Sequence, residues 1–143
     1  MARLPRSVLP SYGIFHVTSR GVNKCMIYLD DDDRRSFTDL FRTTSERQRL
    51  KIWAYVLMGN HYHAVVEAYL ESLSAAFHRI NGTHAQRFNK RHERTGHLFQ
   101  DRFHAKLIRD DEHLGAACEY VWNNPVRIGL CDEAHDWPWG GCL

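Results

Sequence analysis

The sequence lacks any apolar run that approaches the roughly 20 residues of a membrane-spanning helix. The N-terminal segment at 1–10 also contains no apolar stretch of signal-peptide length. None of the four cysteines belongs to a C-x-x-C pair, which argues against a cysteine-based zinc site. Without an export signal, free thiols are the expected state. These absences predict a cytoplasmic protein that does not enter a membrane.

The chain also lacks internal repeats, low-complexity tracts and Pro/Gly/Ser-rich linkers, so one domain over residues 1–143 is the simplest interpretation. A hydrophobic share of 43% with a net charge of only +2 is typical of a globular protein. Positive charge is nevertheless concentrated locally, because residues 78–109 hold eight Lys or Arg side chains against Glu93 and Asp101. Such a segment is either a solvated helix surface or a phosphate-binding face, and charge alone leaves both open.

Local patterns predict strands interspersed with helices, because β-branched and apolar runs alternate with capped segments of helical periodicity. The predicted strands are 12–19, 51–58, 61–68 and 103–108, and the predicted helices are 31–48, 71–91 and 111–123. Gly59 and Asn60 are predicted to form a two-residue type II′ turn between the two middle strands. The whole pattern predicts an α+β fold with a mostly antiparallel sheet and helices packed on it.

Two histidines stand out at the start of the second strand of this hairpin. His61 and His63 are two residues apart, so strand alternation places both imidazoles on one face of the sheet. Two nitrogen ligands side by side on a stiff hairpin are a good start for a divalent metal site. The same pattern is also compatible with one buried histidine and one surface histidine.

A second pair lies near the end of the last predicted helix. Tyr120 and Asn124 are four residues apart, so they are predicted to share a helix face that borders the apolar stripe. In that position both side chains could reach a metal held by the sheet. Alternatively, Tyr120 packs at the edge of the core and Asn124 caps the helix before Pro125. Metal, nucleophile and third ligand together are the parts that phosphodiester transesterification needs.

Five sequence blocks in order resemble those of the REP-associated tyrosine transposases, relatives of the single-strand insertion-sequence transposases within the HUH nuclease superfamily. The blocks are RGVNK at 20–24, MGNHYH at 58–63, RTGHLFQDRF at 94–103, YVWNNPVRIGL at 120–130 and WPW at 137–139. The chain departs from the family pattern at Asp101, where a glycine is usual, and at Trp122 and Asn123. None of these departures touches the candidate catalytic residues.

The resemblance implies a ferredoxin-like HUH nuclease fold and a tyrosine transposase that cuts single-stranded DNA next to hairpin-forming repetitive palindromes. It implies that Tyr120 is the nucleophile of a 5′-phosphotyrosine intermediate, and that His61, His63 and Asn124 hold Mg²⁺ or Mn²⁺. The basic segment would then bind DNA phosphates. The candidate DNA-binding residues are Arg79, Arg87, Lys90, Arg91, Arg94, Arg102 and Lys106.

Two other functions stay open at this point. The chain could be a hairpin-DNA binding module used by its host, with little or no nuclease activity. It could also be a metal-dependent hydrolase or RNA nuclease that uses water as its nucleophile and needs only His61 and His63. The resemblance favours a monomer with all catalytic residues in one chain, and the target sequence, physiological metal and biological role cannot be read from the sequence.

Overall fold

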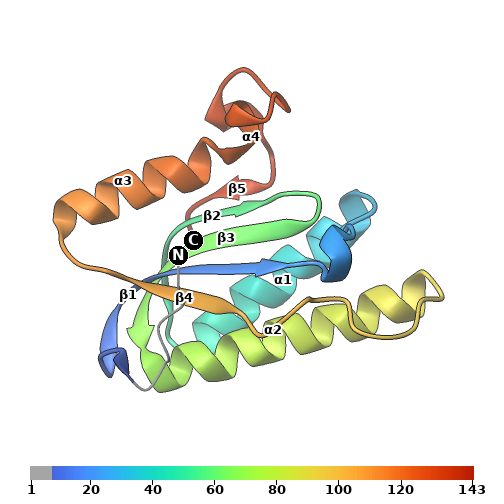
Figure 1. Ribbon diagram of the computed structural model, residues 1–143, viewed down its shortest axis with the longest axis horizontal. Coiled ribbons are helices and arrows are strands. Elements are labelled where there is room, and N and C mark those ends of the chain that lie inside the picture. Colours follow the sequence, from blue (N-terminus) through green and yellow to red (C-terminus); the bar gives the residue numbers. More distant parts are fainter. Residues whose placement is uncertain (1–7) are drawn as a thin grey trace.

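A computed structural model describes residues 8–143 of the chain (Figure 1). The strands are β1 (Tyr12–Arg20), β2 (Lys51–Leu57), β3 (His61–Tyr69), β4 (His104–Ile108) and the short β5 (Gly140–Gly141). The α-helices are α1 (Asp31–Arg47), α2 (Leu70–Arg91), α3 (Asp111–Trp122) and α4 (Asn124–Arg127). Within the described residues there are also the short 3₁₀ helices η2 (Val22–Lys24) and η3 (Ala134–Asp136). No helix in the described part of the chain is long and apolar enough to cross a membrane.

The five strands form one antiparallel sheet in the order β4-β1-β3-β2-β5. The first four strands and the helices α1 and α2 follow one another as β-α-β-β-α-β, which with this order is the ferredoxin-like topology. The predicted α+β fold with an antiparallel sheet is therefore confirmed. The seven predicted strands and helices match the observed elements to within one residue at every end, because each had strong local signals.

Helices cover both faces of the sheet, α1 and α2 on one side and α3 on the other (Figure 1). Alternation along β3 decides which side chains meet which helices. Tyr62 and Ala64 enter the larger core with α1 and α2, whereas Val65 enters the smaller core with α3. His61 and His63 are separated from Val65 by an even number of residues, so their side chains point to the same face of the sheet, the one covered by α3.

Helices α1 and α2 are tied together where α1 begins and α2 ends. Asp30 caps α1 by accepting a hydrogen bond from the Asp33 backbone N–H at 3.0 Å. Asp33, only 4% exposed, accepts from Arg91 Nη1 at 2.6 Å and from His92 Nε2 at 2.8 Å. Burial opposes ionisation of Asp33, but its hydrogen bonds from Leu29, Arg91 and His92 hold the pKa of this carboxyl below its ordinary value. The hydrogen bonds of Asp33 with Arg91 and His92 therefore hold the start of α1 against the end of α2.

The turn between β2 and β3 has the predicted length but not the predicted type. The Met58 N–H donates to the His61 carbonyl at 2.9 Å across the two residues Gly59 and Asn60. However, Gly59 is not among the residues with positive φ, which a type II′ turn requires at this position. A Cβ at residue 59 would lie 2.8 Å from Met26 Sδ, so a larger residue here would require the flexible, exposed Met26 side chain to shift. The tight space beside Met26, and not a positive φ, is what the structure shows at this glycine.

The end of the last long helix also differs from the prediction. Helix α3 ends at Trp122, Asn123 is its C-cap, and Asn124 is the first residue of the short helix α4. The Asn123 side chain donates from Nδ2 to the Glu119 carbonyl at 2.9 Å, so Asn123 takes the capping role expected of Asn124. Pro125 cannot donate a backbone hydrogen bond, which favours this break between the helices. Asn124 thus lies four residues after Tyr120, as the sequence shows, but on a different helix from the one predicted to carry both.

We predict that Gly21→Ala destabilises the fold strongly. Gly21 donates its N–H to the Asn60 carbonyl at 2.8 Å, and a Cβ at this position would lie 2.1 Å from the Cys25 backbone oxygen. The backbone of the β1–α1 loop would have to move, which costs about 2–3 kcal/mol of unfolding free energy. Urea denaturation measures this loss of unfolding free energy. The matched control is Gly82→Ala in α2, where no atom lies within 4 Å of the new Cβ; a Gly21→Ala protein as stable as that control would contradict the packing.

Candidate active site

The β3 strand presents the two predicted metal-binding histidines side by side. The rings of His61 and His63 have centroids 5.1 Å apart. His61 Nδ1 lies 2.7 Å from Asn60 Oδ1, an atom that only accepts, so Nδ1 carries the proton. The lone pair of His61 is therefore on Nε2, the nitrogen available to a ligand.

A third histidine, His16 on β1, supports His63. His16 Nε2 and His63 Nδ1 are 2.9 Å apart, so one ring donates to the other. If His63 donates from Nδ1, its Nε2 keeps a lone pair, which is how a neighbouring acceptor usually orients a metal-binding histidine. No local sequence pattern marks His16, because its contact with His63 depends on the register of β1 against β3, in which Thr18 lies opposite His63.

All three imidazoles are neutral at physiological pH. Burial lowers the pKa of His63 to about 3, and the charges of its histidine neighbours, Arg127 and Arg20 add to this effect. Burial, with a contribution from Lys106, lowers the pKa of His16 to about 4. Burial also lowers the pKa of His61, with Arg20 contributing. Neutral imidazoles are the form in which histidine binds metals.

Tyr120 lies against these histidines from α3. Its ring is edge-on to His63 with centroids 5.8 Å apart and edge-on to His16 at 6.0 Å. The side chain is 48% exposed, so it can meet an incoming substrate while its ring contacts the sheet. The structure thus brings together Tyr120 and His63, which are far apart in the sequence.

Positive charge surrounds this cluster. The guanidinium of Arg127 on α4 lies 4.0 Å above the Tyr120 ring, and its Nη1 lies 3.4 Å from the Tyr120 carbonyl oxygen. Arg20 stands opposite His61 in the β1–β3 register, and Lys106 stands opposite His16 in the β1–β4 register. Arg127 belongs to the YVWNNPVRIGL block, but its stacking on Tyr120 depends on the turn between α3 and α4, which the sequence pattern does not predict.

Asn124 is buried at the start of α4, with only 6% of its surface exposed. Its Nδ2 has no hydrogen-bond partner among the described residues. A buried polar atom left unpaired costs about 1–3 kcal/mol, so Nδ2 is free to pair with a group from outside the described residues. Rotation of the amide exchanges Oδ1 and Nδ2, and an amide oxygen is a suitable ligand for Mg²⁺ or Mn²⁺. By donor type, two neutral imidazoles and one amide oxygen suit a divalent cation.

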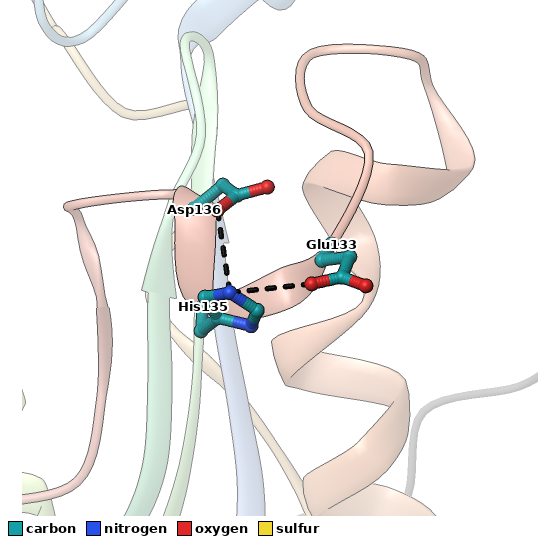
Figure 2. A group of neighbouring side chains, drawn as sticks. All are labelled: Glu133, His135 and Asp136. Atoms are coloured by element: carbon teal, nitrogen blue, oxygen red, sulfur yellow. Dashed lines mark ion pairs between the residues drawn. The ribbon is translucent and has the colours of Figure 1, made fainter.

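A separate group of possible metal ligands lies at residues 133–136 (Figure 2). His135 Nε2 lies 3.2 Å from Glu133 Oε2 and 3.4 Å from Asp136 Oδ1. All three side chains are exposed, and such surface groups commonly pair with each other without an ion. Among the described residues no tyrosine packs on His135, whereas Tyr120 packs against His63.

The predicted DNA-binding residues occupy different environments. Arg79, Arg87 and Lys90 are exposed on α2, and none makes an ion pair with a described residue. Arg91 differs, since it forms ion pairs with Asp30 and Asp33. Arg94 differs as well, because its guanidinium donates hydrogen bonds to the backbone carbonyls of residues 96 and 97 and so stabilises that loop. Arg102 is exposed just before β4, and Lys106 lies on β4.

The sequence and the fold are similar to those of known transposases. The sequence profile of the family described as "Transposase IS200 like" matches residues 14–124, from β1 to the first residue of α4. A Haemophilus influenzae protein with the provisional name REP-associated tyrosine transposase is 27% identical over 117 residues, which cover 72% of this chain and 65% of that protein. The match therefore spans slightly less than two thirds of that relative's length.

Two solved structures share the fold. A REP-associated tyrosine transposase bound to a REP hairpin superposes with a TM-score of 0.77 at 19% identity, over 98% of this chain and 82% of that one. A protein of Deinococcus radiodurans R1, provisionally identified as a transposase, superposes with a TM-score of 0.53 at 14% identity, over 86% of this chain and 97% of that one. Because the family profile covers most of the sequence, including His61, His63, Tyr120 and Asn124, this chain belongs to the IS200-like transposase family.

Proposed function

We propose that this chain is a REP-associated transposase that cuts and rejoins single-stranded DNA at hairpin-forming repetitive palindromes, with Tyr120 as the nucleophile. The observation that carries the proposal is the contact of the half-exposed Tyr120 ring with His63, whose ring lies beside that of His61. A tyrosine oxygen conserves the energy of the phosphodiester bond in a covalent intermediate, as strand transfer requires. The DNA hairpin bound by the solved relative supports the choice of substrate.

In the proposed reaction the phenolic oxygen of Tyr120 attacks the phosphorus of the scissile phosphodiester. The bond between phosphorus and the 3′ oxygen breaks, so the products are a 5′-phosphotyrosine and a free 3′-OH. The proton lost by Tyr120 is balanced by the proton that the departing 3′ oxygen gains. Attack by a 3′-OH on the phosphotyrosine reverses these steps and rejoins the DNA.

His61, His63 and Asn124 are the proposed ligands of a divalent cation, Mg²⁺ or Mn²⁺. When bound, such a cation polarises a phosphoryl oxygen and draws negative charge from the transition state. The chain's own contribution is to keep both imidazoles neutral by burial and to orient them through Asn60 and His16. Because Tyr120 meets His63 within one chain, we infer that a monomer holds a complete site.

Arg127 is proposed to hold Tyr120 in place and to offset negative charge on its oxygen. We predict that Arg127→Ala lowers the cleavage rate on the order of tenfold to a hundredfold, because it removes both the stacked guanidinium and a positive charge near the phosphate. Single-turnover cleavage of a hairpin oligonucleotide measures this, with affinity measured separately.

The matched variant for this prediction is Arg127→Lys. An ammonium keeps the charge but loses the planar stacking on the Tyr120 ring, so partial recovery of the rate is expected. If Arg127→Ala weakened DNA binding but left the rate of the bound complex unchanged, Arg127 would be a phosphate-binding residue without a role in positioning Tyr120.

The proposed function is tested by incubating the protein with an end-labelled hairpin oligonucleotide in Mn²⁺ and resolving the products on a denaturing gel. Cleavage with a protein-linked DNA species, abolished by EDTA, is the expected result. Cleavage without a protein-linked species would indicate water as the nucleophile. Hairpin binding without cleavage would indicate a binding module, and either outcome would overturn the proposal.

A further inference from the structure

A groove runs along α2 on the opposite face of the sheet from Tyr120. It has a volume of about 890 Å³ and lies between α2 and the segment 96–103, which runs beside the helix (Figure 1). We name it the α2 groove. Its size is within the range of pockets that bind small organic groups. None of the residues proposed for cleavage or metal binding lines it.

Small side chains on α2 open the groove. Ala75, Gly82 and Ala85 recur at helical spacing along the lining, and no atom lies within 4 Å of a Cβ placed on Gly82. The base of the groove is largely apolar, with Leu98 and Phe99 contributing from the opposite wall. A flat apolar group can therefore lie against the helix without displacing a side chain.

The opposite wall is held in place by backbone hydrogen bonds. The Val22 N–H donates to the Leu98 carbonyl at 2.8 Å, and the Gln100 N–H donates to the Arg20 carbonyl at 2.9 Å. Phe99 packs with its ring edge-on to Tyr62. The groove is thus formed before any ligand arrives, and no closing motion is needed to build it.

Positive side chains border the groove on both sides. Arg79 and Lys90 are exposed on α2 next to the lining positions, and neither makes an ion pair with a described residue. Arg102 is exposed on the other wall, where His97 and the acidic Asp101 also lie. A flat apolar surface flanked by cations matches one chemical class well: an unstacked nucleobase with the phosphates on either side of it.

The groove is connected to the proposed catalytic residues through β3 and the end of β1. Asn81, which lines the groove, accepts a hydrogen bond from the Tyr62 hydroxyl at 2.6 Å, and Tyr62 stands between His61 and His63. Arg20, whose carbonyl holds the wall, is opposite His61 in the sheet. Both sites therefore lie at the same end of the sheet, within reach of one DNA strand that passes around that end.

The geometry points to the α2 groove as a binding site for an unpaired nucleobase of the DNA strand that flanks the hairpin. This inference rests on the proposed function only for the identity of the substrate as single-stranded DNA. The base lies against the apolar lining, while Arg79, Lys90 and Arg102 contact the neighbouring phosphates. The groove thus adds affinity for a single-stranded extension and helps to set where that strand meets Tyr120.

The test compares a hairpin oligonucleotide that carries an oligothymidine extension, on either end in turn, with the same hairpin lacking it. Gly82→Leu fills the groove, and leucine favours the helix more than glycine does, so the fold is retained. In EDTA, which stops cleavage, this variant is expected to bind the extended hairpin about tenfold more weakly and the blunt hairpin as wild type does. Gly115→Leu, at an equally open glycine of α3, is the control and binds both as wild type does.

A second measurement does not depend on a variant. Each thymidine of the extension is replaced in turn by iododeoxyuridine, and irradiation of the wild-type complex is expected to crosslink one of them to a peptide of α2 or of 96–103. Crosslinks confined to other peptides, or full affinity of Gly82→Leu for the extended hairpin, would overturn the inference. Formation of the covalent adduct by wild type in Mn²⁺ is scored separately, so failure of the groove and failure of the proposed function are distinguishable.

Discussion

Replacing Tyr120 by phenylalanine is expected to lower DNA cleavage by at least about a thousandfold while leaving hairpin binding unchanged. The change removes one oxygen atom, the proposed nucleophile. It leaves the ring, which contacts His63 and His16 and lies beneath the Arg127 guanidinium. Because the packing of the site is preserved, a loss of rate reports on the chemistry and not on the fold. Single-turnover cleavage in Mn²⁺ and hairpin affinity in EDTA are the two measurements.

A matched control is available on β1. Tyr12 is 48% exposed, as Tyr120 is, but its hydroxyl donates to Glu67 Oε2 at 2.6 Å, away from the histidines. Tyr12→Phe is expected to cleave as wild type does. Cleavage by Tyr120→Phe at the wild-type rate would contradict the proposed role and would favour an enzyme that activates water.

The second large effect is expected from His63→Ala. Loss of this imidazole removes a proposed metal ligand and also the group that Tyr120 and His16 pack against. We predict a fall in cleavage of about a thousandfold or more, together with loss of Mn²⁺ binding, since the cation's stabilisation of the transition state is worth several kcal/mol. Mn²⁺ binding is measured by electron paramagnetic resonance, and cleavage by the same oligonucleotide assay.

His135→Ala is the control for this experiment, because it disrupts the exposed group formed with Glu133 and Asp136 (Figure 2). This variant is expected to keep both cleavage and Mn²⁺ binding at the β3 site. If His135→Ala abolished cleavage and His63→Ala did not, the functional cation would lie at residues 133–136 and the proposed ligand set would be wrong.

Much of the fold could be predicted because its signals are local. The buried stripe of α2, which includes Phe77 and His84, follows helical periodicity in the sequence alone. The β2–β3 hairpin was predictable from two apolar runs around a short polar turn. The turn type was not, because Gly59 does not adopt the positive φ of a type II′ turn and lies instead beside Met26, a residue that only the folded chain brings close.

The candidate site was predictable in part for the same reason. Alternation along β3 puts His61 and His63 on one face wherever the strand lies. The support from His16 depends on strand register, and the position of Arg127 over Tyr120 depends on the break between α3 and α4. That break also moved Asn124 off the helix of Tyr120. Register and interhelix geometry are properties of tertiary packing, which no local pattern encodes.

The most direct test of the central proposal is mass spectrometry of the protein after reaction with a single-stranded hairpin oligonucleotide in Mn²⁺. Proteolysis should yield the peptide that contains Tyr120 with a nucleotide attached to the phenolic oxygen through phosphate. That result would establish Tyr120 as the nucleophile. Complete cleavage of the oligonucleotide with an unmodified Tyr120 peptide, or an adduct on another residue, would contradict it.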